Sequence, residues 1–101
     1  MDDKGLQDLK DQLEPLINQI RQLHEQAYHI YKPNVEDLIK AQIKDRNIIE
    51  RQLDHLLDHC DNEKVVTLFK KLCRYFWEID ASATAEYIWF YKEMWEDDIL
   101  N

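Results

Sequence analysis

Hydrophobic residues in the first third of the chain recur at steps of three and four, which is the spacing of one face of an α-helix. Pro15 falls within this pattern and leaves it in phase on both sides, so we expect a kinked helix or two collinear pieces. The pattern predicts a long amphipathic helix over residues 6–31. Its apolar positions are Leu6, Leu9, Leu13, Leu16, Ile17, Ile20, Leu23, Ala27 and Tyr31.

A second periodic segment follows a proline. Pro33 disfavours helical backbone at Lys32, and Asn34 is a good N-cap residue, so the sequence predicts a break between the two segments. Two long helices joined by so short a link are expected to fold back as an antiparallel hairpin of residues 6–31 and 35–60. The apolar positions of the second helix are Val35, Leu38, Ile39, Ile43, Ile49, Leu53, Leu56, Leu57 and Cys60.

The C-terminal part of the chain is rich in aromatic residues, since nine of the eleven lie between positions 69 and 95. A break at 60–63 precedes a helix over residues 65–79, whose apolar side chains cover a wide arc and predict deep burial. Asp80 or Ser82 can cap a last helix that continues to Trp95. Two short aromatic helices are therefore expected to pack on the hairpin, with Phe90 and Met94 in the core.

The composition favours the same architecture. One glycine and two prolines are too few for the many tight turns of a β-sandwich or barrel. A length of 101 residues fits one hydrophobic core. We expect an all-α fold, an up-and-down helical bundle of about four helices in a single helical domain over residues 1–101.

The net charge of −8 is spread evenly, with −4 on residues 1–60 and −4 on residues 61–101. An acidic surface repels phosphate, so we do not expect direct nucleic-acid or anionic-membrane binding. The same charge supports an alternative function, in which the chain imitates DNA and inhibits a nucleic-acid-binding protein. The longest apolar run, Tyr87–Tyr91, is shorter than the ~18 residues of a membrane span, and we expect a cytoplasmic protein.

Two histidines raise a metal hypothesis. His55 and His59 are one helical turn apart with Asp58 beside them, a spacing that can chelate zinc. A projection of a helix over 35–60 places both rings opposite Leu53 and Cys60, on a solvated face. The pattern therefore favours no metal site, with a helical metal-binding protein that uses His55, Asp58 and His59 as the alternative.

Other residues with reactive side chains are expected to have structural roles. His24 lies within the first apolar stripe and is interpreted as a core-edge histidine with a hydrogen-bond partner. Cys60 and Cys73 occupy apolar positions and are expected to be buried free thiols. The spacing of residues suggests neither a nucleophile–base pair nor a phosphate-binding loop. We expect a non-enzymatic protein without a cofactor.

Three residues are candidates for binding a partner protein. Trp89 lies off the main apolar face of the last helix, near Ala85, and Ile48 lies on the outer face of the second predicted helix. Exposed large apolar residues, Trp in particular, are enriched at protein interfaces. The sequence therefore predicts a protein–protein interaction module that self-associates or binds a protein partner, with Trp89 as its anchor.

Overall fold

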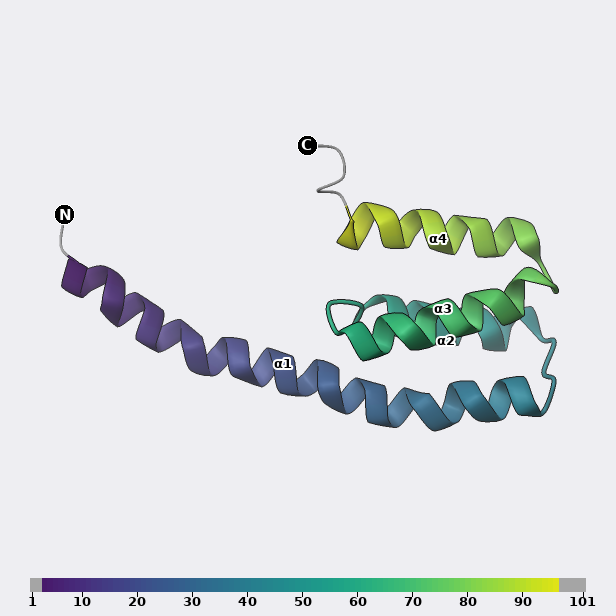
Figure 1. Ribbon diagram of the computed structural model, residues 1–101, viewed down its shortest axis with the longest axis horizontal. Coiled ribbons are helices and arrows are strands. Elements are labelled where there is room, and N and C mark those ends of the chain that lie inside the picture. The colour runs from purple at the N-terminus through teal and green to yellow at the C-terminus, as the bar shows by residue number, and fades with distance from the viewer. Residues whose placement is uncertain (1–2, 97–101) are drawn as a thin grey trace.

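The computed structural model describes residues 3–96 and consists of four α-helices joined by short turns (Figure 1). They run up and down, each antiparallel to the one before it. The predicted all-α bundle is confirmed, and the described residues contain no strand. The helices are α1 (Asp3–Lys40), α2 (Arg46–Leu57), α3 (Glu63–Trp77) and α4 (Ala81–Trp95).

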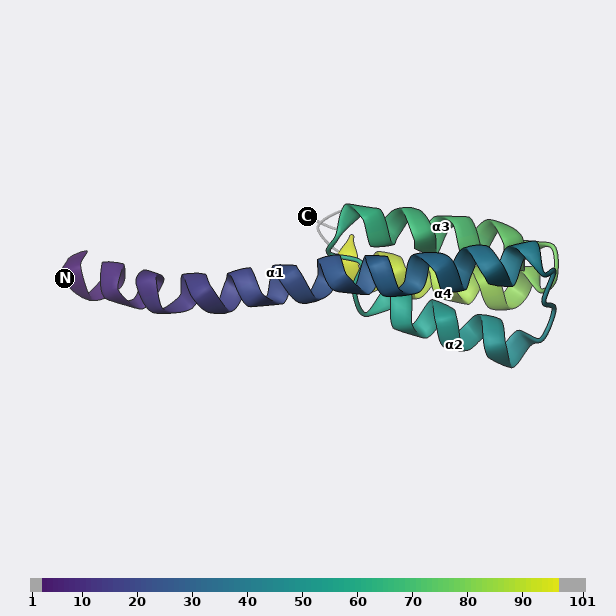
Figure 2. The same cartoon turned by 90° about the horizontal axis from the view of Figure 1, so that it is seen from below.

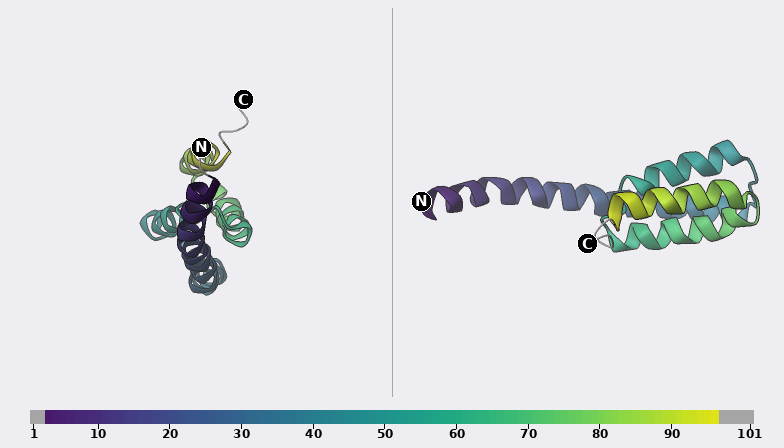
Figure 3. Two further views of the ribbon diagram at one scale, coloured as in Figure 1. Left: turned by 90° about the vertical axis from the view of Figure 1, so that its left-hand side faces the viewer. Right: turned by 90° about the horizontal axis from the view of Figure 1, so that it is seen from above.

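The third helix is the centre of the bundle, because α3 packs against each of the other three. Seen end on, α2 and α3 lie side by side, with α1 below them and α4 above (Figure 3). From below, α1 runs between α2 and α3 (Figure 2). This arrangement explains the wide buried arc predicted for α3. Its buried residues are Val65, Leu68, Phe69, Leu72, Cys73 and Phe76.

The outer side of α4 differs from the prediction. Phe90 and Met94 are about half exposed, although their pattern had placed them in the core. The reason is that α4 packs mainly on α3, so only one side of it is covered. Tyr87 faces inward, where its hydroxyl donates to the Asp54 carboxylate at 2.8 Å.

The end of α1 is also different from the prediction. The break expected at Lys32-Pro33-Asn34 is absent, because α1 continues through Pro33 to Lys40. Pro33 lies on the exposed side of the helix, and so does His29, the residue whose carbonyl loses its helical hydrogen bond to the proline. The predicted helices 6–31 and 35–60 are therefore replaced by α1 and the much shorter α2.

The true break follows Lys40 and is built by the backbone. Gln42 adopts a left-handed conformation with φ 55°. Its N–H donates to the carbonyl of Ile39 at 3.0 Å, and the N–H of Ile43 donates to Leu38 at 3.1 Å, which is the Schellman pattern of a helix end. The Asp45 side chain then accepts from the first N–H groups of α2.

The two later breaks lie where the sequence places them. Asn62 caps α3 by accepting from the N–H groups of Lys64 and Val65. Asp80 caps α4 by accepting from the N–H of Ala83. In the part of the chain that the structure describes, no helix combines the length and apolarity needed to cross a membrane.

Candidate protein-binding surface

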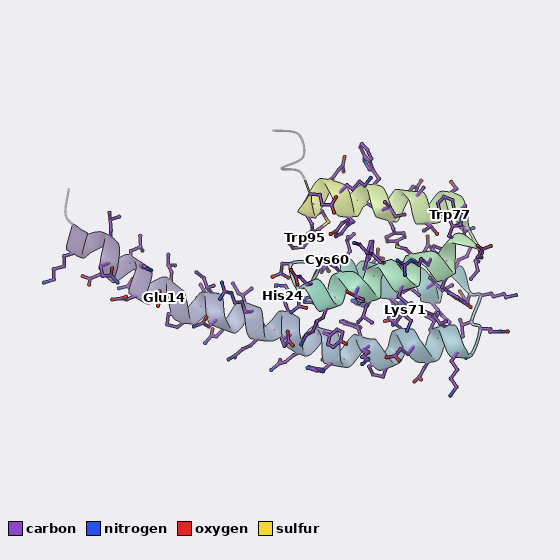
Figure 4. The ribbon with its side chains drawn as sticks, viewed as in Figure 1. Glu14, His24, Cys60, Lys71, Trp77 and Trp95 are labelled. Atoms are coloured by element: carbon purple, nitrogen blue, oxygen red, sulfur yellow. The ribbon has the colours of Figure 1, made fainter. Side chains whose placement is uncertain are left out.

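The N-terminal half of α1 projects beyond the bundle (Figure 1). This helix has 38 residues, whereas α2 has 12 and α3 has 15. The two shorter helices therefore cover only the C-terminal half of α1. All residues from 4 to 23 are exposed, and His24 is the first that is partly buried. Figure 4 shows Glu14 on the projecting part and His24 where α1 meets the bundle. We call residues 4–23 the α1 extension.

One face of the α1 extension is apolar along its whole length. Seven Leu and Ile side chains on this face are between 44% and 59% exposed. Single exposed hydrophobes are ordinary, but a contiguous row of this length is typical of an interaction surface. We call this row the extension stripe. It consists of Leu6, Leu9, Leu13, Leu16, Ile17, Ile20 and Leu23.

The extension stripe continues the face of α1 that forms the bundle core. At ~100° per residue, the stripe has the same direction as Ala27, Val35 and Leu38, which are buried under α2 and α3. The face is thus covered over residues 24–40 and uncovered over residues 6–23. The extension stripe therefore resembles one half of a hydrophobic core, because no other helix packs against it.

Six residues of the extension stripe follow a heptad repeat. Their spacing alternates between three and four, which is the repeat by which paired helices form a coiled coil. Pro15 lies on the opposite face, so its ring does not interrupt the stripe. The six positions, in a and d order, are Leu6, Leu9, Leu13, Leu16, Ile20 and Leu23.

The extension stripe ends at a cluster of polar side chains. The Nδ1 atom of His24 lies 2.8 Å from Nδ1 of His59 and 3.0 Å from a carboxylate oxygen of Asp61. This gives His24 the partly buried, partnered position that its place in the stripe predicted. Burial lowers the pKa of His59, and the nearby His24 lowers it further.

A second set of contacts holds the α2–α3 turn against α1. The ammonium of Lys64 lies 2.7 Å from Glu25, and the side-chain amide of Asn62 donates to the same carboxylate at 2.8 Å. The hydrogen bond from Lys64 is the main cause that lowers the pKa of Glu25. These contacts fix the level along α1 at which the bundle begins.

The residues of the metal hypothesis do not form one site. The ring of His55 stacks on Tyr31 with centroids 5.5 Å apart, and His59 turns toward His24. The predicted orientation away from the core is wrong for His59, because α2 ends at Leu57 and His59 belongs to the following turn. Asp58 is exposed. Within residues 3–96, no group of three or more His, Cys, Asp or Glu residues is arranged to hold a metal ion.

Two of the three predicted partner-binding residues lie together. Trp89 is 60% exposed, and it lines a shallow hollow on α4 with Ala85 and Phe90. Ile48 is exposed on α2 and does not line this hollow. Sequence reasoning thus located an apolar surface on α4, but it assigned the larger one, the extension stripe, to the interior of a hairpin. The regular alternation of three and four was the signal that pointed to it.

A groove of about 610 Å³ lies between α3 and α4. Its apolar wall includes Phe69, Trp77 and Ile88, and Cys73 lies among them. Cys60 and Cys73 are both buried and free, as predicted. Burial raises the pKa of each thiol to about 12. Both therefore remain protonated and unreactive at neutral pH.

Comparison with known proteins finds no relative of the chain. No family model matches it, and no curated protein or solved structure matches it either.

Proposed function

We propose that the chain is a non-enzymatic protein–protein interaction module that binds through the extension stripe. The observation that carries this proposal is that one continuous face of α1 is a bundle core over residues 24–40 and is exposed over residues 6–23. An amphipathic helix presents its apolar face to another protein surface in many recognition modes. A helical partner fits this face best, because its heptad spacing suits helix pairing.

The energetics favour covering the extension stripe. Complete burial of a Leu or Ile side chain is worth about 1.5–3 kcal/mol, and these side chains are roughly half exposed, so each gains about 1 kcal/mol when covered. Seven such gains are comparable to an association cost that begins at ~4 kcal/mol. Burial of the extension stripe against a partner is therefore sufficient to offset the cost of association.

The polar groups support a binding role rather than catalysis. His24 and His59 contact each other, and the thiol of Cys60 donates to the carbonyl of Leu56 at 3.2 Å. The hydroxyl of Tyr87 donates to the Asp54 carboxylate at 2.8 Å, and the carbonyl oxygen of Glu50 in α2 lies 3.3 Å from the same hydroxyl. The contacts of His24 and Tyr87 join different parts of the bundle, and the contact of Cys60 lies at the end of α2, so each of these groups is engaged in a structural contact.

The test compares two double variants of the full chain with the same change in charge. Leu13→Lys with Ile20→Lys alters the extension stripe, and Asn18→Lys with Gln22→Lys alters the opposite face of the same helix. We expect affinity capture from cells that naturally express the chain to recover a protein that the second variant retains and the first loses. Recovery of the same proteins by both variants would contradict the proposal.

The surface around Trp89 is a second candidate contact for the same function. Trp89 and Phe90 are both exposed on α4, and Ala85 leaves space between them and Ser82. Trp89→Ser in the same capture experiment measures its contribution. A partner that is lost with Trp89→Ser and retained with the altered stripe would move the interface to α4.

A further inference from the structure

We propose that the partner of the extension stripe is a second copy of this chain, with the two α1 helices antiparallel. This inference rests on the proposed function and makes it specific. It follows from the length of the stripe, the position of the bundle and the distribution of charge.

The extension stripe is complementary to itself. It begins at an a position, Leu6, and ends at a d position, Leu23, so two copies laid antiparallel with these ends level place every a residue opposite a d residue. The contact is roughly 27 Å long at 1.5 Å per residue. The layers are Leu6 with Leu23 of the other copy, Leu9 with Ile20, and Leu13 with Leu16.

The flanks of this pairing are also compatible. On one side, Ile17 of each copy lies beside Lys10 of the other, whose aliphatic stem can cover it. On the other side, the uncharged Gln12 and Gln19 face each other. Pro15 points outward from both helices. No flank therefore places two like charges directly opposite each other.

The position of the bundle selects the antiparallel orientation. By helical projection, the extension stripe has the direction of the α1 residues that are buried under α2 and α3. These two helices lie above α1 in Figure 1. A parallel partner helix would run along this face into the space that α2 and α3 occupy. An antiparallel partner instead carries its own bundle beyond the N-terminus of the first copy. Helix pairing without displacement of the bundle is therefore possible in one direction.

The charges favour self-association through this segment. Residues 4–23 have equal numbers of acidic and basic residues, whereas the whole chain has a net charge of −8. The neutral segments meet, and the acidic bundles lie at opposite ends of the dimer.

Disulfide trapping in the full chain tests the orientation. Antiparallel pairing places Leu9 beside Ile20 of the other copy, while the two Leu9 residues lie about 16 Å apart along the axis. A disulfide requires Cα atoms within about 7 Å. We therefore expect an equal mixture of Leu9→Cys and Ile20→Cys chains to form a covalent dimer on mild oxidation. Each variant alone should do so at least about tenfold more slowly.

A matched pair gives the background rate. Asp11→Cys and Asn18→Cys lie at equal levels in the proposed dimer but on its outer side, so their mixture should react as slowly as either single variant. Rapid dimer formation by Leu9→Cys alone would show parallel helices and overturn the proposed orientation. Equal rates in the two mixtures would overturn the pairing itself.

Sedimentation of the unmodified chain separates this inference from the proposed function. We expect a monomer–dimer equilibrium between about 1 and 500 μM that Leu13→Lys with Ile20→Lys abolishes and Asn18→Lys with Gln22→Lys leaves unchanged. A monomer throughout this range overturns the second copy as partner. If the chain is a monomer but the stripe variant still loses a captured protein, the proposed function stands and only the identity of the partner changes. If Leu13→Lys with Ile20→Lys still forms the dimer, the extension stripe is not the dimer interface.

Discussion

At the residue scale, the contact between His24 and His59 makes the bundle sensitive to pH. Two imidazole nitrogens 2.8 Å apart need one hydrogen and one lone pair between them, so the contact is lost when both rings are charged. Burial, and then His24, lowers the pKa of His59 from its ordinary value of 6.5. Asp58 and Asp61 raise this pKa and His55 lowers it, each more weakly. Below pH 6.5 the unfolded chain therefore binds this proton more readily than the folded one. The resulting stabilisation is complete above pH 6.5 and is lost as the pH falls.

His59→Gln tests this effect. We expect the Tm of the wild type to fall between about pH 7.5 and 5.5, and the fall to be smaller in the variant because one source of proton uptake is gone. The lowered pKa of Glu25 acts below its ordinary value of 4.5 and so lies outside this range. His29→Gln, at an exposed position, is the control. Equal falls in the wild type and His59→Gln would refute the assignment.

Gln42 carries a second prediction at this scale. Its φ of 55° is a conformation that costs a residue with a Cβ about 1–2 kcal/mol and costs glycine little. Gln42→Gly should therefore raise the free energy of unfolding by roughly 1 kcal/mol, measured by urea denaturation. Ala41→Gly, one residue earlier at a negative φ, should lower it. The interpretation fails if both glycines destabilise the chain.

At the scale of elements, the sequence predicted the helices that have strong end signals. Asp80 caps α4 as expected, Asn62 caps α3 within the break predicted at 60–63, and the wide apolar arc of α3 is buried. The end of α1 was not predictable in the same way. Pro33 predicted a break, yet α1 continues through this exposed proline. The true end of α1 has Gln42 in a left-handed conformation, at a position that is usually glycine or asparagine.

The same mistake explains why the extension stripe was assigned to a core. An apolar stripe has one spacing whether another helix covers it or not. Coverage depends on how long the neighbouring helices are, and the missed break at residues 41–45 shortens α2 to 12 residues. The residues of the stripe were thus predictable from the sequence, and their exposure was not.

Asn62 gives a prediction about how the elements are joined. Its side chain caps α3 and also donates to Glu25 of α1, so Asn62→Ala removes both contacts. We expect a loss of about 1–2 kcal/mol in the free energy of unfolding. Asn62→Ser retains the cap but not the link, and should lie between the wild type and Asn62→Ala in urea denaturation. If Asn62→Ser equals Asn62→Ala, the cap contributes no stability.

At the scale of the whole molecule, stability and association belong to different parts of the chain. The buried residues come from residues 27–87, whereas residues 4–23 are all exposed. The bundle therefore does not need the α1 extension to form its core. The extension, in turn, is a single helix with one apolar face, and such helices gain most of their stability from packing.

A chain of residues 21–101 separates the two parts. We expect it to retain the cooperative melt and the near-ultraviolet circular dichroism of the packed aromatic residues, because every buried residue is present. The Tm of the full chain should rise with protein concentration, since association stabilises the folded state by mass action. The Tm of the shortened chain should not. A concentration-dependent Tm in the shortened chain would place the interface on the bundle, where Trp89 is exposed, and loss of its cooperative melt would show that the extension contributes to folding.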